Sequence, residues 1–440
     1  MEKIFTRVLL GKKTKMKKLF LLMVLAFWLG TSCLWVSCSY ENHDNPVEYP
    51  DLEPEPEPEP EPVPEQNAEY VAALKEPNCY MVQAGEAVSI PVMKAYAVWE
   101  LFASELENVE MENQVPEPVL LWQDAQSLIT NVGLIPGETH EKDNITVSVS
   151  GSVKSGNALV GVKIAGEIRW SWHIWVTPYN PDKDPVAMGR IYPYDNNGDG
   201  VDDYIFMDRN LGAVNTTVNL GTTMADSLAA CGLLYQWGRK DPFPGDSKFK
   251  YSTNNNPYYD SKPIYTIENV LLTEGSQNGG TGIRSVKADM DQTRTSLTKS
   301  IVNPLTVLLG PYGYNDWLEE RCDTLWNNQK GGKAPFDPCP EGWRVPINKN
   351  GTYPWNGFEL ATTEYSPLGV FPMAGFRYCV GGGILKNSGH TAEVWIGDVN
   401  ANFTGNARYL SIYYDYAHRA IVKADVGARS NAASVRCVKE

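Results

Sequence analysis

Residues 51–66, DLEPEPEPEPEPVPEQ, constrain the fold more than any other stretch, because proline occupies every second position over most of their length. Proline lacks a backbone N–H donor and fixes φ at about −65°, so this stretch can form neither a helix nor a central strand. It also has too few apolar side chains to bury a core. Polyproline II at ~3.1 Å per residue gives it a reach of about 50 Å, stiffened by repulsion between glutamates. We interpret residues 38–67 as a disordered acidic linker and expect compact domains after it.

The residues before this linker have the three-part pattern of an export signal. Residues 12–18 are basic, residues 19–29 are apolar, and small residues then lead to Cys33 and Cys38. Small residues directly before a cysteine are typical of lipidation boxes, although each leucine lies four positions upstream and not at the usual third. We predict that residues 1–37 are a lipoprotein signal peptide and that Cys38 carries the lipid. Lipidation of Cys33 and an uncleaved membrane helix are the alternatives.

The charge balance excludes one class of partner. The chain carries a formal net charge of −15, and loss of its basic N-terminal segment would make the mature protein more acidic still. Such a surface repels nucleic acid and anionic membranes, because their charge is also negative. We therefore expect no nucleic-acid partner, and membrane attachment through the lipid anchor only.

The cysteines favour disulfides over metal sites. All 8 cysteines occur without a C-x-x-C pair and without histidines at metal-ligand spacing, which excludes zinc and thioredoxin-like interpretations. In an exported protein, the cysteines beyond the leader are typical of one or two disulfides and not of reactive thiols.

Residues 68–182 have the pattern of an all-β domain, with short apolar runs between Gly, Pro and Asn turns. The runs lie at residues 80–82, 88–92, 119–122, 145–149, 159–164 and 167–176. Within residues 168–174 large apolar side chains occupy alternate positions, which predicts a strand with one buried face. His173 would then point outward, as a surface or interdomain residue and not as a catalyst. The strand count and length predict an immunoglobulin-like β-sandwich.

Beyond residues 178–185, which we interpret as an interdomain link, the sequence predicts helices as well as strands. The expected elements are hairpin strands at residues 191–194 and 204–208, a helix at 225–237, and a second helix within 301–309 and 317–326. Residues 254–289 are polar and weakly periodic, and we interpret them as a long insertion.

Near the C-terminus, DPCPEGWRVP (residues 337–346) predicts a rigid, extended segment. Prolines on both sides of Cys339 and a third after Val345 fix φ and exclude a helix. In such a segment Trp343 and Val345 point to the same face. SVRCV (residues 434–438) alternates in the same way, as a terminal strand would.

Five motifs in this order resemble the FISUMP-type major paralogous domain, a C-type-lectin-like module of surface lipoproteins and fimbrium tip subunits. They are MDRNLGA (207–213), GLLYQWGRKDPFPG (232–245), DPCPEGWRVP, AGFR (374–377) and SVRCV. The resemblance implies a C-type-lectin-like domain at residues 186–440, and we predict that a Cys339–Cys437 disulfide closes it. The expected fold is thus mainly β, an immunoglobulin-like β-sandwich followed by an α+β C-type-lectin-like domain.

The predicted hairpin tip at residues 195–203 has the oxygen spacing of a calcium loop. The candidate ligands are Asp195, Asn197, Asp199, the backbone carbonyl of Val201, and Asp203. Calcium takes about six to eight hard oxygen ligands, and this spacing wraps them around one point. Phe206 stands where an EF-hand has glutamate, which excludes a full EF-hand and leaves a looser Ca²⁺ loop. The alternative is a β-turn that needs no metal.

Signatures of catalysis are few. The chain has 5 histidines and no G-x-S-x-G, H-E-x-x-H or phosphate loop. Residues 342–346 are similar to the GWRLPT-type run of formylglycine-generating enzymes, whose fold is also C-type-lectin-like. Those enzymes work through a closely spaced cysteine pair, whereas Cys322 and Cys339 are well separated. We therefore do not expect an enzyme.

The densest cluster of aromatic and cationic groups marks the expected binding residues. It comprises Tyr413, Tyr414, Tyr416, His418 and Arg419. Tyrosine offers a large amphipathic contact at low entropic cost, and its ring can stack on sugars. Since strand alternation buries only about half of such a run, we expect the exposed members to bind the ligand.

Together these features predict an exported outer-membrane lipoprotein, at the cell surface or in a fimbrium, that acts as an adhesin. Its ligand would be a glycan or a host or bacterial surface protein. Two alternatives stay open. One is a structural pilin-like subunit that contacts other fimbrial subunits by strand addition, and the other is a carbohydrate-active enzyme.

Overall fold

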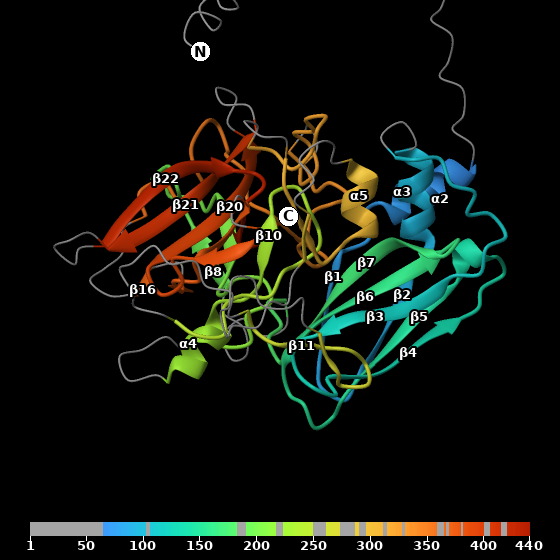
Figure 1. The fold of residues 1–440 in the computed structure, drawn as a ribbon. Coiled ribbons are helices and arrows are strands. Elements are labelled where there is room, and N and C mark those ends of the chain that lie inside the picture. The colour runs from blue at the N-terminus through green and yellow to red at the C-terminus, as the bar shows by residue number, and fades with distance from the viewer. Residues whose placement is uncertain are drawn as a thin grey trace, which may run out of the picture. The chain divides into compact units, whose positions relative to one another are not determined.

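The polypeptide forms a mainly β fold in the part of the chain that the computed structural model describes (Figure 1). The described residues are 65–102, 106–182, 191–216, 223–249, 261–272, 287–289, 296–310, 315–327, 331–358, 365–366, 369–379, 382–399, 405–414 and 420–440. The predicted signal peptide, the predicted lipidation site Cys38 and most of the predicted linker lie outside them. Val63–Glu440 form one compact unit. No helix in the described ranges is long and apolar enough to span a membrane.

The larger sheet of the N-terminal part contains four strands from that part and two short strands from further along the chain. Its order is β1 (Cys79–Val82), β7 (Glu167–Val176), β6 (Gly156–Ile164), β3 (Glu117–Gln123), β11 (Ile264–Tyr265) and β12 (Leu271–Leu272). β1 pairs with β7 in parallel, and the other neighbours are antiparallel. The predicted strands are confirmed, and part of the expected insertion at 254–289 joins this sheet through β11.

The second sheet has the order β2 (Ala87–Pro91), β5 (Asn144–Val149) and β4 (Ile129–Ile135). Its buried side chains belong to the same hydrophobic core as those of the first sheet. The sequence did not predict β4, nor the helices α2 (Glu65–Ala73) and α3 (Met93–Leu101) beside the sheets. Six consecutive residues of α3 are buried, so the helix has no polar stripe to reveal a helical period.

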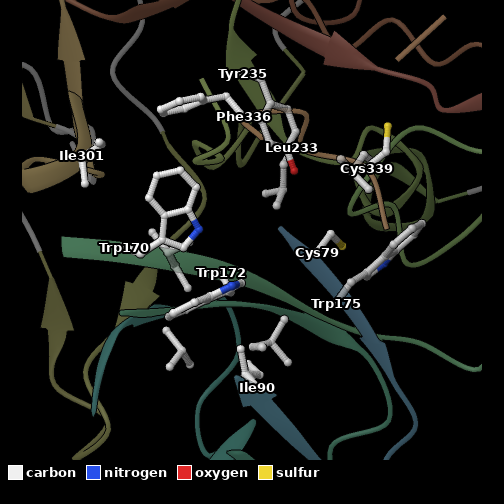
Figure 2. Close-up of a cluster of buried hydrophobic side chains, with 14 of the residues drawn as sticks. Cys79, Ile90, Trp170, Trp172, Trp175, Leu233, Tyr235, Ile301, Phe336 and Cys339 are labelled. Carbon is white, nitrogen blue, oxygen red and sulfur yellow. The ribbon is translucent and has the colours of Figure 1, made fainter. Parts of the chain in front are cut away.

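Strand β7 is buried on both faces, which corrects the prediction of one buried face. Trp170, Trp172 and Ile174 are fully buried, and so are the alternating Ser171 and His173. Residues of the C-terminal part cover the second face of β7, where Ser171 Oγ donates a hydrogen bond to Asp241 Oδ1 at 2.6 Å. Figure 2 shows tryptophans of β7 in one cluster with Leu233, Tyr235 and Phe336 from that part. His173 does not point outward to solvent; it lies buried between the two parts.

The large sheet of the C-terminal part has the order β19 (Ile384–Lys386), β18 (Phe376–Tyr378), β23 (Ala432–Val435), β20 (Thr391–Val399), β21 (Asn406–Tyr414) and β22 (Ala420–Ala428). A further strand, β10 (Leu234–Gln236), pairs with β23. The predicted helix at 225–237 is therefore wrong in its second half, because α4 covers only Met224–Ala230. The helix cannot continue through Gly232, because the φ of this residue is 72°, outside the helical region. A Cβ at this position would lie 2.6 Å from the Leu211 carbonyl oxygen, so only glycine fits.

The second predicted helix is mostly wrong, because the observed helix shares only Ile301 and Val302 with the predicted residues 301–309. Helix α5 covers Leu297–Val302, and Pro304 follows before β14 (Thr306–Leu308), which pairs with β13 (Lys287–Asp289). Residues 317–326 contain no helix, although Trp317 and Trp326 at their ends are buried. Three smaller elements lie elsewhere in the described chain: η1 (His140–Lys142), β16 (Tyr365–Ser366) and β17 (Gly369–Val370).

The predicted hairpin and the C-terminus share a sheet of order β15 (Trp343–Arg344), β24 (Val438–Lys439), β9 (Tyr204–Met207) and β8 (Ile191–Tyr194). The Cys339–Cys437 disulfide is present, with Cα atoms 6.0 Å apart. The Asp337 carboxylate accepts hydrogen bonds from the backbone N–H groups of Cys339 and Val345, both at 2.8 Å. These bonds hold the segment in place, and it contains no helix, as predicted. It is not extended throughout, because Pro340–Trp343 form a turn in which Gly342 has a φ of 71°, and only Trp343–Arg344 form a strand.

Candidate ligand-binding surface

The antiparallel strands β20, β21 and β22 present two different faces, and one of them carries the predicted Tyr413. Residues paired across such strands point to the same side of the sheet. The register aligns one residue from each strand in a row across the sheet. Three successive rows are Thr391, Tyr413 and Ile421; Glu393, Ser411 and Lys423; and Trp395, Tyr409 and Asp425. We call these nine residues the Tyr413 face. The opposite face buries Ala392, Val394, Leu410 and Ile412 in a core.

The Tyr413 face changes from buried to open along the strands. At one end Trp395 is fully buried, and its indole Nε1 donates to the Tyr235 carbonyl oxygen at 2.8 Å. Tyr409 is half-buried and packs edge-on against Trp395, with ring centroids 5.5 Å apart. At the other end Tyr413 is half-buried, and Lys423 in the adjoining row is exposed. A ligand could therefore reach the Tyr413 end.

Gly427 allows the Tyr409 ring to lie against strand β22. A Cβ at this position would be 2.8 Å from Tyr409 Cε1, closer than real Cβ contacts come. The ring fills the space that a side chain at 427 would need, so Tyr409 serves packing more than ligand contact.

The five predicted binding residues have different outcomes. Tyr413 is half-buried at the open end of the face named after it. Its neighbour in β21, Tyr414, is 40% exposed on the opposite side of the strand. Tyr416, His418 and Arg419 lie outside the described residues. The structure instead brings Glu393, Lys423 and Asp425 near Tyr413, although none of them stands out in the sequence alone.

The charges on this face form a small cluster. Lys423 Nζ lies 2.6 Å from Asp425 Oδ2 and 5.7 Å from the centroid of the Tyr413 ring. The hydrogen bond to Asp425 raises the pKa of Lys423. Burial, and then the charge of Asp425, raise the pKa of Glu393 to about 8. At neutral pH the face thus offers an aromatic ring, an ion pair and a largely protonated carboxylic acid that can both donate and accept hydrogen bonds.

Buried cationic contacts hold the base of this sheet. Arg429, which directly follows β22, is buried; its guanidinium lies 4.3 Å from the Trp237 ring centroid and 2.9 Å from Asp316 Oδ2. The Trp237 indole donates to the Ile396 carbonyl oxygen at 2.9 Å. Because these groups hold β20 at Ile396 and the chain directly after β22, the Tyr413 face stands on a rigid support.

The predicted calcium loop is closed by its own amide groups. Asp195 accepts hydrogen bonds from the N–H groups of Gly198 and Gly200, both at 2.7 Å, and Asp199 accepts one from Val201 at 2.9 Å. The bond from Gly200 is the main cause of a lowered pKa at Asp195. Asp203 accepts a bond from the Asn196 N–H at 3.1 Å. Across the described ranges no group of three or more His, Cys, Asp or Glu side chains could hold a metal ion.

Comparisons with protein-family models, with curated proteins and with solved structures found no match to this chain.

Proposed function

We propose that the protein is an exported surface lipoprotein, anchored through Cys38, that binds a glycan or a surface protein through the Tyr413 face. In this proposal the C-terminal part is C-type-lectin-like and the N-terminal sheets are an immunoglobulin-like sandwich. The observation that carries the proposal is the combination of Tyr413, the Lys423–Asp425 pair and the protonated Glu393 on one supported sheet face. Aromatic faces stack on sugar rings, while the polar groups can hydrogen-bond hydroxyls.

The test begins with an array of glycans and surface proteins probed with the mature chain. For the ligand found, Tyr413→Ala should weaken binding by roughly thirtyfold, or ~2 kcal/mol, if this residue is a hot spot. Lys423→Ala should weaken binding as well, and both variants should keep the melting temperature of the wild type.

Tyr414→Ala is the matched control, because it removes the neighbouring tyrosine from the opposite side of β21. A loss of binding in Tyr414→Ala with none in Tyr413→Ala would contradict the proposal. Equal losses of stability and binding would mean that these tyrosines serve packing. Release of a product from a bound glycan would instead favour an enzyme.

A second candidate is a structural subunit that assembles by strand addition. Strand β22 is 9 residues long and, among the described residues, pairs only with β21, so its other edge is open to a further strand. Concentration-dependent polymers that a proline at the centre of β22 abolishes would favour this candidate over the adhesin.

A further inference from the structure

A cleft of about 1090 Å³ lies in the N-terminal part of the molecule, between helix α3, η1, the end of β4 and residues 108–115. None of the residues that line it belongs to the Tyr413 face. Its carboxylates are Glu100, Glu110, Glu112, Glu138, Glu141 and Asp143. We call it the acidic cleft.

The charge of the acidic cleft has one sign. Among the described residues no lysine or arginine lines it, and the one basic side chain there, His140, has Nδ1 3.3 Å from Asp143 Oδ2. Glu141 accepts a hydrogen bond from the Tyr70 hydroxyl at 2.7 Å. Asp143 also accepts the Gly137 N–H at 2.7 Å. Two of the carboxylates thus have partners within the protein.

The other four carboxylates have no ion-pair partner in the described part of the chain, and all four are exposed. Like charges around one concave surface repel one another, and such a surface concentrates field lines that attract cations. A cationic ligand would relieve this repulsion. The negative charge of the cleft therefore favours a positively charged ligand.

Apolar groups in the acidic cleft determine which size and shape of ligand fits it. Tyr96, Trp99 and Met111 line the cleft and are more than nine-tenths buried, whereas Val115 beside them is 65% exposed. Trp99 is fixed, because its indole donates to the Arg169 carbonyl oxygen at 2.8 Å and the Arg169 guanidinium lies 4.6 Å from its ring centroid. The volume of about 1090 Å³ is at the top of the range of about 300–1,000 Å³ that small-molecule pockets have. A small polyamine would use the charges but leave the apolar groups without contacts.

We propose that the acidic cleft binds a lysine- or arginine-rich peptide segment of a partner protein, with an apolar side chain between its cations. The cations pair with the four exposed glutamates, and the apolar side chain packs against the exposed Val115 at the edge of the buried apolar lining. This surface is separate from the ligand site proposed above, so either can exist without the other.

The test uses the mature chain and a fluorescent peptide, acetyl-KVKGKVK-amide, with binding followed by anisotropy at several salt concentrations. A triple variant, E110Q/E112Q/E138Q, should weaken binding by roughly tenfold or more and flatten its salt dependence. The matched control is E86Q/E117Q/E268Q, which removes equal charge from exposed sites outside the cleft. This control should leave binding within roughly twofold of the wild type.

Further arms test the chemistry of the peptide. Replacement of its lysines by glutamine should abolish binding, and replacement of its valines by serine should weaken it. The proposal fails if both triple variants weaken binding equally, because general charge would then suffice. It also fails if spermidine competes as well as the peptide, or if the peptide does not bind at low salt. Unchanged melting temperatures in both triple variants would show that the fold is intact.

Discussion

The buried His173 should make the stability of the protein depend on pH between the unfolded and folded pKa values of this residue. Its Nε2 lies 3.0 Å from Asn157 Oδ1, and its Nδ1 lies 3.4 Å from the Tyr235 hydroxyl oxygen. The Asn157 amide nitrogen donates to Asp124 and Gly212, so its Oδ1 faces the imidazole as an acceptor. This network suits a neutral ring with the proton on Nε2. Burial lowers the pKa of His173 to about 3, and the charge of Asp124 opposes this only in part.

The sign and size of the effect follow from proton linkage. An unfolded histidine titrates at about 6.5, so between that pH and about 3 the unfolded chain binds a proton that the folded protein excludes. The contribution of His173 is therefore fully present above pH ~6.5 and is lost as the pH falls toward ~3. The loss is ~2 kcal/mol at pH ~5 and about 4–5 kcal/mol by pH ~3, at ~1.36 kcal/mol per pH unit.

The measurement is urea unfolding of the wild type and of His173→Gln across this pH range. The variant loses a constant amount of stability from altered packing, but it cannot titrate, so the difference between the two proteins isolates His173. That difference should shrink by ~2 kcal/mol between pH ~7.5 and pH ~5. Tyr235→Phe is the control, because it removes the facing hydroxyl and keeps the imidazole. Parallel stability curves for wild type and His173→Gln would refute the reasoning.

Three further predictions concern the disulfide, the hairpin loop and the Tyr413 face. Replacing Cys339 and Cys437 by serine should lower the free energy of unfolding by up to ~4.7 kcal/mol, because the bridge spans 98 residues; a loss below ~1 kcal/mol would contradict the chain-entropy argument. If the hairpin loop binds Ca²⁺, millimolar Ca²⁺ should raise the melting temperature and Asp199→Ala should abolish the rise; no change with Ca²⁺ or chelator would favour the metal-free turn. The pKa of Glu393 is raised to about 8 in the folded protein, so between pH ~4.5 and ~8 the folded protein binds a proton that the unfolded chain has lost. The contribution of Glu393 to stability should therefore fall as the pH rises through this range. Glu393→Gln should remove that slope in urea unfolding, and an unchanged slope would show that Glu393 titrates normally.

The N-terminal strands could be predicted because short apolar runs lie between Gly, Pro and Asn turns, and the limits of the alternation within residues 168–174 explain the error at β7. Alternation shows that one face of a strand is buried. It does not show what covers the other face, because the covering residues Asp241 and Tyr235 are distant in sequence from Ser171 and His173. Helix α3 was missed for a related reason, since burial on all sides removes the polar stripe that marks an amphipathic helix.

The candidate site was predictable only in part, because its residues meet through strand register. The sequence selected Tyr413 from local composition. Its neighbours Glu393 and Lys423 come from β20 and β22, and the pairing of whole strands decides which of their residues share its face. A shift of one residue in either pairing would have placed different side chains beside Tyr413.

The disulfide loop links the two parts of the molecule as well as closing the C-terminal one. Asn78, just before β1, donates through its side-chain amide to the carbonyl oxygens of Pro335 and Asp337, at 2.7 and 2.8 Å. The backbone of Cys79 also bridges to Pro340, beside the disulfide. The N-terminal sheet therefore contacts the same short segment that the bridge fixes, so the two parts should unfold together. A ligand that binds the folded protein at either proposed surface would then stabilise the whole unit, because linkage acts on the common unfolding equilibrium.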